Sequence, residues 1–266
     1  MRYPWVNIAL LFLLGFQILT GFLGLVTGNE ALHWIIQLHD LGGYAIAVLL
    51  LWKGVIIFDV LSRVRHLNVA RSAFLLMTGL LLLILATGLV WPWVGYASSY
   101  GFSLMTIHAL LTIALGGLLL WHTLARRFVL RFRYVGGRRA FLRFAGIAVA
   151  GVFFSQLAEV ANAALHLPGS ARRFTGSYQA GEPGQFPVVS WLLDFPPPVD
   201  VNQWRLVVDG QVEHPSSFSY DQLKELASDS LEETIDCTGG WYSKQEWRGV
   251  NLARLLESAG VKDNAQ

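Results

Sequence analysis

Residues 102–124, FSLMTIHALLTIALGGLLLWHTL, form an apolar run that contains two histidines and no acidic residue, lysine or arginine. A run of about 20 apolar residues is long enough to cross a hydrocarbon core ~30 Å thick as a helix. His108 and His122 are 14 residues apart. That interval is almost four helical turns, so both side chains face the same way, about 21 Å apart along the axis. Histidine inside a membrane span is costly and usually functional.

Three other long apolar runs, at residues 4–26, 34–61 and 72–93, precede this one, and a weaker run follows at 141–165. The chain is 54% hydrophobic and only 14% charged, whereas soluble domains carry roughly 25% charged residues. The fold class expected is therefore multi-domain. An all-α transmembrane bundle of four helices spans residues 1–130, and a fifth transmembrane helix lies within 138–167.

The charges of the connecting loops alternate along the chain. Residues 27–33 and 94–101 contain no lysine or arginine, whereas the other two loops are rich in arginine: Arg63, Arg65 and Arg71, then Arg126, Arg127, Arg131, Arg133, Arg138 and Arg139. The positive-inside rule then puts the N-terminus in the cytoplasm and everything after the fifth helix outside. We expect a multi-pass protein of the bacterial inner membrane with an extracytoplasmic C-terminal domain. The net charge of +2 is too small to suggest a nucleic-acid partner.

Two histidines are expected at matching depth near the outer face. His39 lies five residues into the second run and His108 six residues into the fourth, and both runs lead inward. Two neutral imidazoles on neighbouring helices are what a six-coordinate haem iron needs. The simpler alternative, polar contacts between helices, accounts for one histidine but not for the matched depth and the 14-residue interval.

The stretches around these histidines, LHDLGGY at 38–44 and IHALL at 107–111 followed by His122, resemble the cytochrome b subunits of formate dehydrogenase and nickel–iron hydrogenase. The resemblance covers residues 1–130. It implies haem b on His39 and His108, with His122 serving a second, inner haem, and exchange of electrons with quinone or quinol. The positions at which a partner for His122 is expected hold Pro4 and Lys53, and His66 of an inner loop is the alternative. We therefore expect one haem near the outer face.

The fifth helix is preceded by Arg138-Arg139-Ala140-Phe141-Leu142-Arg143. This motif resembles the twin-arginine export signal. Arginines also occur at the inner flank of any membrane helix, which is the plainer interpretation.

Residues 168–266 are expected to form an outward-facing α+β domain. Pro168–Pro198 is rich in Gly, Pro and Ser and reads as irregular chain. Beyond it, 204–208 and 233–237 have the pattern of strands. Ser219 with Gln222 predicts a capping box, and Asn251 predicts a helix start.

Cys237 is the only cysteine, so the chain forms no internal disulfide. It lies in DCTGGW at 236–241, after WRLVVDG at 204–210 and before EWRGV at 246–250. This order is similar to the molybdopterin-binding domain of the sulfite oxidase family. The resemblance implies that Cys237 is the thiolate ligand of molybdenum, with small neighbours that admit the pterin, and that Trp241 is a pocket wall. A buried inert cysteine and a core tryptophan are the plainer interpretations. The resemblance covers residues 186–266, so the domain looks C-terminally incomplete.

Together these features predict a membrane-bound molybdenum-dependent oxidoreductase. Electrons would pass between the quinone pool, haem b and a molybdopterin centre that exchanges an oxygen atom with a small substrate. The first alternative is a cytochrome b relay with a degenerate docking domain, which passes electrons to a redox partner protein. The second is a non-redox membrane receptor or assembly factor.

Overall fold

The computed structural model describes residues 3–62, 69–125, 134–190 and 197–265. Within these ranges the chain forms two compact units. The first comprises Met1–Ala180, Pro187–Leu192 and Asp236–Tyr242, and the second comprises Gly181–Phe186, Leu193–Ile235 and Ser243–Gln266. The short segment around Cys237 thus belongs to the helical unit. The sequence instead predicts that this segment lies in a separate domain that begins at residue 168.

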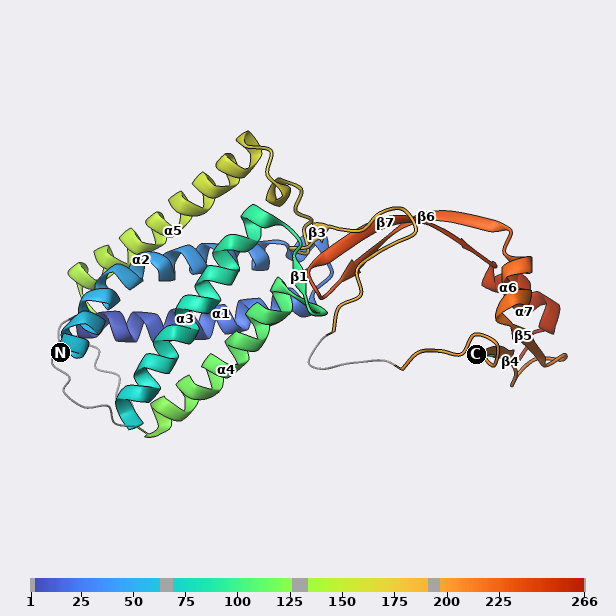
Figure 1. The fold of residues 1–266 in the computed structure, drawn as a ribbon, viewed down its shortest axis with the longest axis horizontal. Helices are drawn as coiled ribbons and strands as arrows, with labels where there is room; N and C mark the ends of the chain where they lie inside the picture. The colour runs from blue at the N-terminus through green and yellow to red at the C-terminus, as the bar shows by residue number, and fades with distance from the viewer. Residues whose placement is uncertain (1–2, 63–68, 126–133, 191–196, 266) are drawn as a thin grey trace. The chain divides into compact units, whose positions relative to one another are not determined.

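Five long helices build the first unit (Figure 1): α1 Pro4–Val26, α2 Trp34–Ser62, α3 Val69–Val94, α4 Leu104–Ala125 and α5 Arg138–Ala164. All five are long and apolar enough to cross a membrane, which confirms the helices expected from the apolar runs. Pro4 occupies the first turn of α1, where its missing N–H costs nothing.

The helices pack mainly as α1 on α2, α2 on α5, and α3 on α4. Small residues permit the closest approach, as is usual between membrane helices. A side chain at Gly151 of α5 would lie 2.9 Å from the carbonyl oxygen of Leu41 on α2. At the end of the bundle near the N-terminus, Trp5, Ile46 and Leu49 belong to a buried apolar cluster.

The outward surface of these helices is apolar. Phe12, Phe58, Leu120 and Phe153 are each at least 60% exposed. A soluble monomer rarely exposes so many large apolar side chains, whereas lipid solvates them without cost. The helical unit is therefore compatible with a membrane protein.

Short elements lie at the ends of the helices. These are η1 Glu30–Leu32, the strand pair β1 Ser98–Ser99 and β2 Phe102–Ser103, and η3 Pro168–Ser170. Strand β3 Tyr178–Gln179 pairs in parallel with the first residues of β7 Trp241–Gly249, and β7 neighbours β6 Asp229–Cys237.

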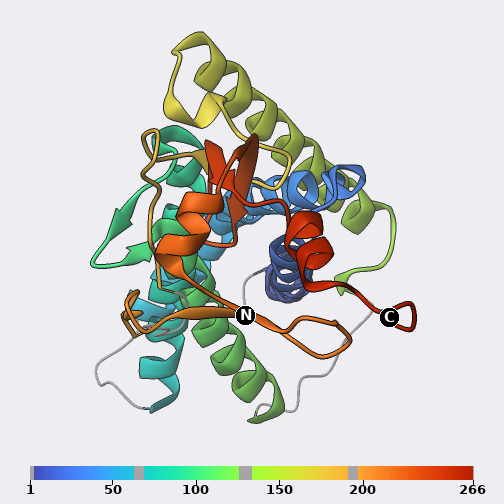
Figure 2. The same ribbon diagram turned by 90° about the vertical axis from the view of Figure 1, so that its right-hand side faces the viewer.

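The second unit contains the antiparallel pair β4 Arg205–Val208 and β5 Ser216–Ser219. Figure 2 shows its two short helices, α6 Tyr220–Leu226 in orange and α7 Leu252–Ala259 in red. The capping box of Ser219 with Gln222 and the Asn251 cap are both confirmed. Strand β6 begins at Asp229, four residues before its predicted start, because pairing with β7 extends it across polar residues that show no apolar alternation.

Several predicted features lie outside the described residues. They are His66 and the loop arginines Arg63, Arg65, Arg126, Arg127, Arg131 and Arg133. Of the arginines used for orientation, Arg71 lies near the start of α3, and Arg138 and Arg139 open α5.

The orientation is tested with a reporter that is active only outside the cytoplasm. Fused after Gly169, beyond α5, it should be active, and fused after Asn68, between α2 and α3, it should be silent. The physical reason is the arginine excess on the side of Asn68. The reverse result would show that the orientation is wrong.

Candidate functional site

The helical unit encloses a cavity of about 320 Å³ lined by all of its long helices and by the segment that follows α5. Its middle is apolar, with Leu81, Ile84, Leu85, Leu115 and Leu119. At one end it is lined by polar side chains, among them Asp40, Glu159, Asn162, Arg172, Arg173 and Tyr178. The volume falls in the range of about 300–1,000 Å³ typical of ligand and cofactor pockets.

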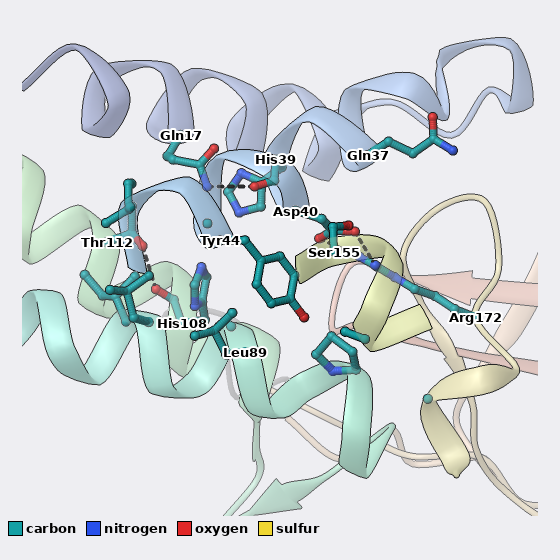
Figure 3. Close-up of a pocket in the computed structure, with 18 of the residues that line it drawn as sticks. Gln17, Gln37, His39, Asp40, Tyr44, Leu89, His108, Thr112, Ser155 and Arg172 are labelled. Atoms are coloured by element: carbon teal, nitrogen blue, oxygen red, sulfur yellow. Dashed lines mark hydrogen bonds and ion pairs between the residues drawn. The ribbon is translucent and has the colours of Figure 1, made fainter. Parts of the chain in front are cut away.

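Two of the predicted ligands, His39 of α2 and His108 of α4, come together inside this cavity (Figure 3). Their ring centres are 6.1 Å apart and the ring planes are inclined by 79°. Bonds of about 2.0 Å from a metal to each imidazole nitrogen place the two nitrogens about 4 Å apart. The ring centres lie farther from the metal than the nitrogens do, so they must be more than 4 Å apart. A separation of 6.1 Å between the ring centres is therefore compatible with one metal ion between the two rings.

Each imidazole has a threonine hydroxyl at its Nδ1 atom. Thr20 Oγ1 of α1 lies 3.1 Å from Nδ1 of His39, and Thr87 Oγ1 of α3 lies 2.9 Å from Nδ1 of His108. Thr20 also donates to the Phe16 carbonyl at 2.9 Å, and Thr87 to that of Ile84 at 2.9 Å.

A threonine hydroxyl has one proton. When that proton is donated to a helix carbonyl, the hydroxyl oxygen can interact with the histidine Nδ1 only as an acceptor. The ring proton then sits on Nδ1, which leaves the Nε2 lone pair of both His39 and His108 for a metal.

Glycines give both rings the space they occupy. A side chain at Gly21 would lie 2.9 Å from Cε1 of His39, and one at Gly88 would lie 3.0 Å from Cε1 of His108. The pairs Thr20-Gly21 and Thr87-Gly88 therefore serve the two histidines in the same way. One helix of each hairpin holds the imidazole carried by the other.

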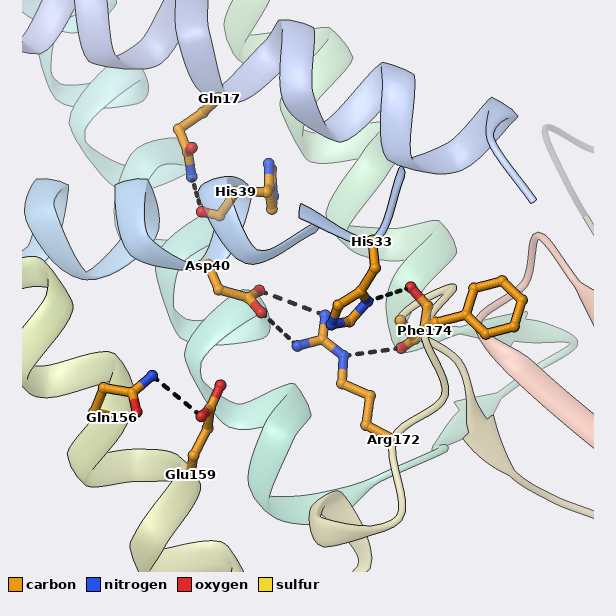
Figure 4. A network of polar contacts seen from close by, with 9 residues as sticks. Gln17, His33, His39, Asp40, Gln156, Glu159, Arg172 and Phe174 are labelled. Atoms are coloured by element: carbon orange, nitrogen blue, oxygen red, sulfur yellow. Dashed lines mark hydrogen bonds and ion pairs between the residues drawn. The ribbon is translucent and has the colours of Figure 1, made fainter. Parts of the chain in front are cut away.

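The polar end of the cavity is built around an ion pair (Figure 4). Arg172 Nη1 lies 2.5 Å from Oδ2 of Asp40, the residue after His39. Burial by itself would lower the pKa of Arg172, but Asp40 more than offsets it and the net shift is upward, so this guanidinium stays charged. Burial also raises the pKa of Tyr178 to about 12, so its phenol keeps its proton.

Four buried polar atoms of cavity-lining residues have no hydrogen-bond partner among the described residues: Gln17 Oε1, Asn162 Oδ1, Arg173 Nε and the Tyr178 hydroxyl. Unsatisfied buried polar groups are costly and need an explanation. A ligand with an apolar body and a polar edge would satisfy such groups while filling the apolar middle of the cavity.

The structure does not bring His122 to this cavity. His122 is half-buried in the last turn of α4 and is absent from the cavity lining. Lys53, at the position where a partner is expected, donates to Oδ1 of Asn7 at 2.8 Å. The described residues contain no group of three or more His, Cys, Asp or Glu side chains that could hold a metal ion. A haem held by two histidines needs only two such ligands.

Cys237 ends β6 and begins the turn into β7. The Gly239 amide lies 3.3 Å from the Cys237 sulfur, and the Gly240 amide donates to the Cys237 carbonyl at 2.9 Å. The thiol is half-buried and forms no disulfide. Trp241 is buried, at 4% exposure, and its backbone pairs with that of Tyr178.

Sequence reasoning missed the threonines, Arg172 and Arg173. The threonines lie 19 and 21 residues before their histidines, and no local pattern links positions so far apart. Arg172 and Arg173 fall in a stretch whose Gly and Ser content indicated irregular chain. Two charged residues directly after a membrane helix were the available signal.

Comparison with known proteins identifies the C-terminal part of the chain. Residues 193–266 match the oxidoreductase molybdopterin binding domain. This part of the chain is thus an oxidoreductase-type molybdopterin-binding domain, which follows the helical region of five apolar helices.

One relative is the protein described as uncharacterized oxidoreductase YuiH of Bacillus subtilis, which is 35% identical over 81 residues. The match covers 30% of this chain and 40% of the relative, so this chain spans less than half of that protein's length. No solved structure matches the chain. The domain match and the relative both support an oxidoreductase.

Proposed function

We propose that this chain is a membrane-bound oxidoreductase that passes electrons between the quinone pool, a haem b held by His39 and His108, and a molybdopterin centre held by Cys237. One observation carries the haem part of the proposal. His39 and His108 face each other inside an apolar cavity, with ring centres 6.1 Å apart and both Nδ1 atoms beside threonine hydroxyls.

The residues present fit haem b. His39 and His108 would hold it, the leucines of the cavity would contact its apolar surface, and Arg172 and Tyr178 lie at the cavity's polar end. A bound haem supplies one-electron chemistry between its ferric and ferrous states. The protein's part is to present two lone pairs, exclude water and keep cationic and hydroxyl groups near the carboxylates of the cofactor.

The molybdenum part of the proposal is supported by the domain match over residues 193–266. Cys237 is the one thiol of the chain, and soft thiolate ligands suit soft metals. Gly239 and Gly240 follow it closely, and at both positions an added Cβ would collide with a neighbouring side chain, Val189 at 2.5 Å and Trp91 at 2.6 Å. Molybdopterin supplies oxygen-atom transfer when bound, and the substrate we propose is a small molecule that gains or loses one oxygen atom.

We further propose that the protein lies in the bacterial inner membrane with residues 168–266 outside. Lipid would contact the apolar helix faces, and quinone or quinol would reach the haem from the bilayer. The arginines that open α5 support this orientation, and Arg138 and Arg139 would also suit export of a folded domain through the twin-arginine route.

We expect one haem per chain. His39→Ala and His108→Ala should each abolish most haem binding, because each removes an axial ligand. His122→Ala should leave it unchanged, because His122 does not line the cavity. The measurement is a pyridine haemochrome assay against protein concentration. A ratio near two that falls to one in His122→Ala would contradict the single-haem assignment.

Thr20→Val and Thr87→Val test the role of the hydroxyls. Each keeps the side-chain shape but removes the acceptor at Nδ1, so the imidazole becomes a poorer donor to ferric iron. We expect haem affinity to fall about 10–100-fold, as for other outer-shell partners, and the reduction potential to rise. Thr112→Val is the matched control, since Thr112 lines the cavity but donates to the His108 carbonyl. Equal effects of all three variants would refute the assignment.

Cys237→Ser tests the molybdenum ligand. The variant should lose molybdenum, measured by elemental analysis of the purified protein, and keep the haem spectrum, because the two ligand sets are separate. Full molybdenum retention would show that Cys237 is not the anchor. Haem without molybdenum in the unmodified protein would favour a cytochrome that only relays electrons.

A further inference from the structure

Two adjacent arginines pair with two carboxylates, each of which is next to a proposed ligand. Arg172 pairs with Asp40, which follows His39 in the sequence. Arg173 pairs with Asp236, which precedes Cys237, at 3.0 Å between Nε and Oδ2. All of these residues belong to the helical unit. The chain thus joins the two ligand segments through one dipeptide.

Asp236 is held by more than this ion pair. The Ser177 hydroxyl donates to Oδ1 at 2.7 Å and the Thr175 hydroxyl donates to Oδ2 at 2.7 Å. An isolated surface ion pair contributes little. The two hydroxyl hydrogen bonds fix the Asp236 carboxylate in position, because charge-assisted hydrogen bonds are short and strong, and Arg173 adds an ion pair rather than a third hydrogen bond.

The segment that carries these donors is itself tied to the helices. Arg172 donates to the Gly176 carbonyl at 3.3 Å, and its guanidinium lies over the Tyr178 ring at 5.9 Å. His33, just before α2, shares a hydrogen bond of 2.7 Å with the Phe174 carbonyl. Residues 172–178 are therefore anchored both to α2 and to the Cys237 turn.

Gly240 brings the turn against the ends of α3 and α4. A side chain there would lie 2.6 Å from Trp91 and 2.9 Å from Met105, and its φ of +85° disfavours any other residue. The Tyr178 amide donates to the Gly240 carbonyl at 3.1 Å. The ring of Tyr178 in turn packs edge-on against Trp91, with 5.4 Å between centres.

We propose that Arg172 and Arg173 are positioning residues that hold the Cys237 turn on the end of the helical bundle where His39 and His108 lie. The turn would then keep a fixed separation from the histidine pair, which electron exchange within one chain requires. The inference rests on the proposed function for the identity of the cofactors that His39, His108 and Cys237 bind. The docking of the Cys237 turn is inferred from the observed contacts alone.

The docking is tested by hydrogen exchange of the full chain in detergent, read by mass spectrometry on peptides covering 178–180 and 236–242. Arg173→Ala should accelerate exchange in both peptides at least about tenfold, because the amides of Tyr178 and Gly240 lose their protection. Gly240→Ala should do the same by preventing the close approach. Arg173→Lys should lie between the unmodified chain and Arg173→Ala.

Arg254→Ala is the matched control. It breaks an ion pair of similar length with Asp229, at 3.3 Å, in the second unit. It should leave both peptides unchanged. Unaltered exchange in Arg173→Ala, or the same acceleration in Arg254→Ala, would overturn the docking role.

A second readout separates this inference from the proposed function. Because Arg173 also lines the cavity, the rate is expressed per bound haem and per bound molybdenum, and on that basis reoxidation of dithionite-reduced haem by an oxo-donor substrate should slow at least about tenfold in Arg173→Ala. If hydrogen exchange of the turn is faster in Arg173→Ala but the rate of haem reoxidation is unchanged, the positioning role would be overturned. Absence of haem or molybdenum from the unmodified protein would refute the proposed function. The docking of the turn would then be tested by the hydrogen-exchange measurement alone.

Discussion

The haem proposed for this protein depends on two imidazoles that lie close together in an apolar bundle. A buried polar ring without partners is costly, and here each ring gains a threonine hydroxyl at Nδ1. Both rings also line the cavity of the helical unit. The threonine contacts also join neighbouring helices, and the haem proposal rests in addition on the two rings lining one cavity with centres 6.1 Å apart. The proposed haem would bind between two imidazoles whose Nδ1 atoms already have threonine partners.

The same arrangement sets the helix pairing. α1 supplies Thr20 and Gly21 to the histidine of α2, and α3 supplies Thr87 and Gly88 to the histidine of α4. Each helical hairpin thus supplies one histidine together with the threonine that contacts it. The cavity is lined by both hairpins. α5 adds Ser155, Glu159 and Asn162 to the cavity wall, packed against α2 through Gly151. The fifth helix therefore completes the site and also leads into the segment that holds the Cys237 turn.

Much of this could be predicted from the sequence, for physical reasons. Hydrocarbon imposes length and composition on a spanning helix, so all five helices were predicted. The similar positions of His39 and His108 near the starts of two apolar runs predicted that the two side chains lie close together, and the structure confirms it. The local rules of capping predicted the starts of α6 and α7. The domain type followed from the residues around Cys237, and the match over residues 193–266 supports it.

What escaped prediction depends on contacts between distant positions. Thr-Gly also occurs at residues 27–28 and 78–79, so the dipeptide alone does not mark a histidine partner. The link from Asp40 to Arg172 spans 132 residues, and that from Ser177 to Asp236 spans 59. Composition assigned residues 168–198 to linker because they are rich in glycine, proline and serine, yet Arg172, Thr175 and Ser177 within them hydrogen-bond to Asp40 and Asp236.

The central claim, one haem held by His39 and His108, is tested most directly by electron paramagnetic resonance of the oxidised protein in detergent. Two imidazole ligands make ferric haem six-coordinate and low-spin. The account predicts a low-spin signal in the unmodified protein, which is lost or replaced by a high-spin signal in both His39→Ala and His108→Ala. A protein without haem, or a low-spin signal that survives either substitution, would contradict it.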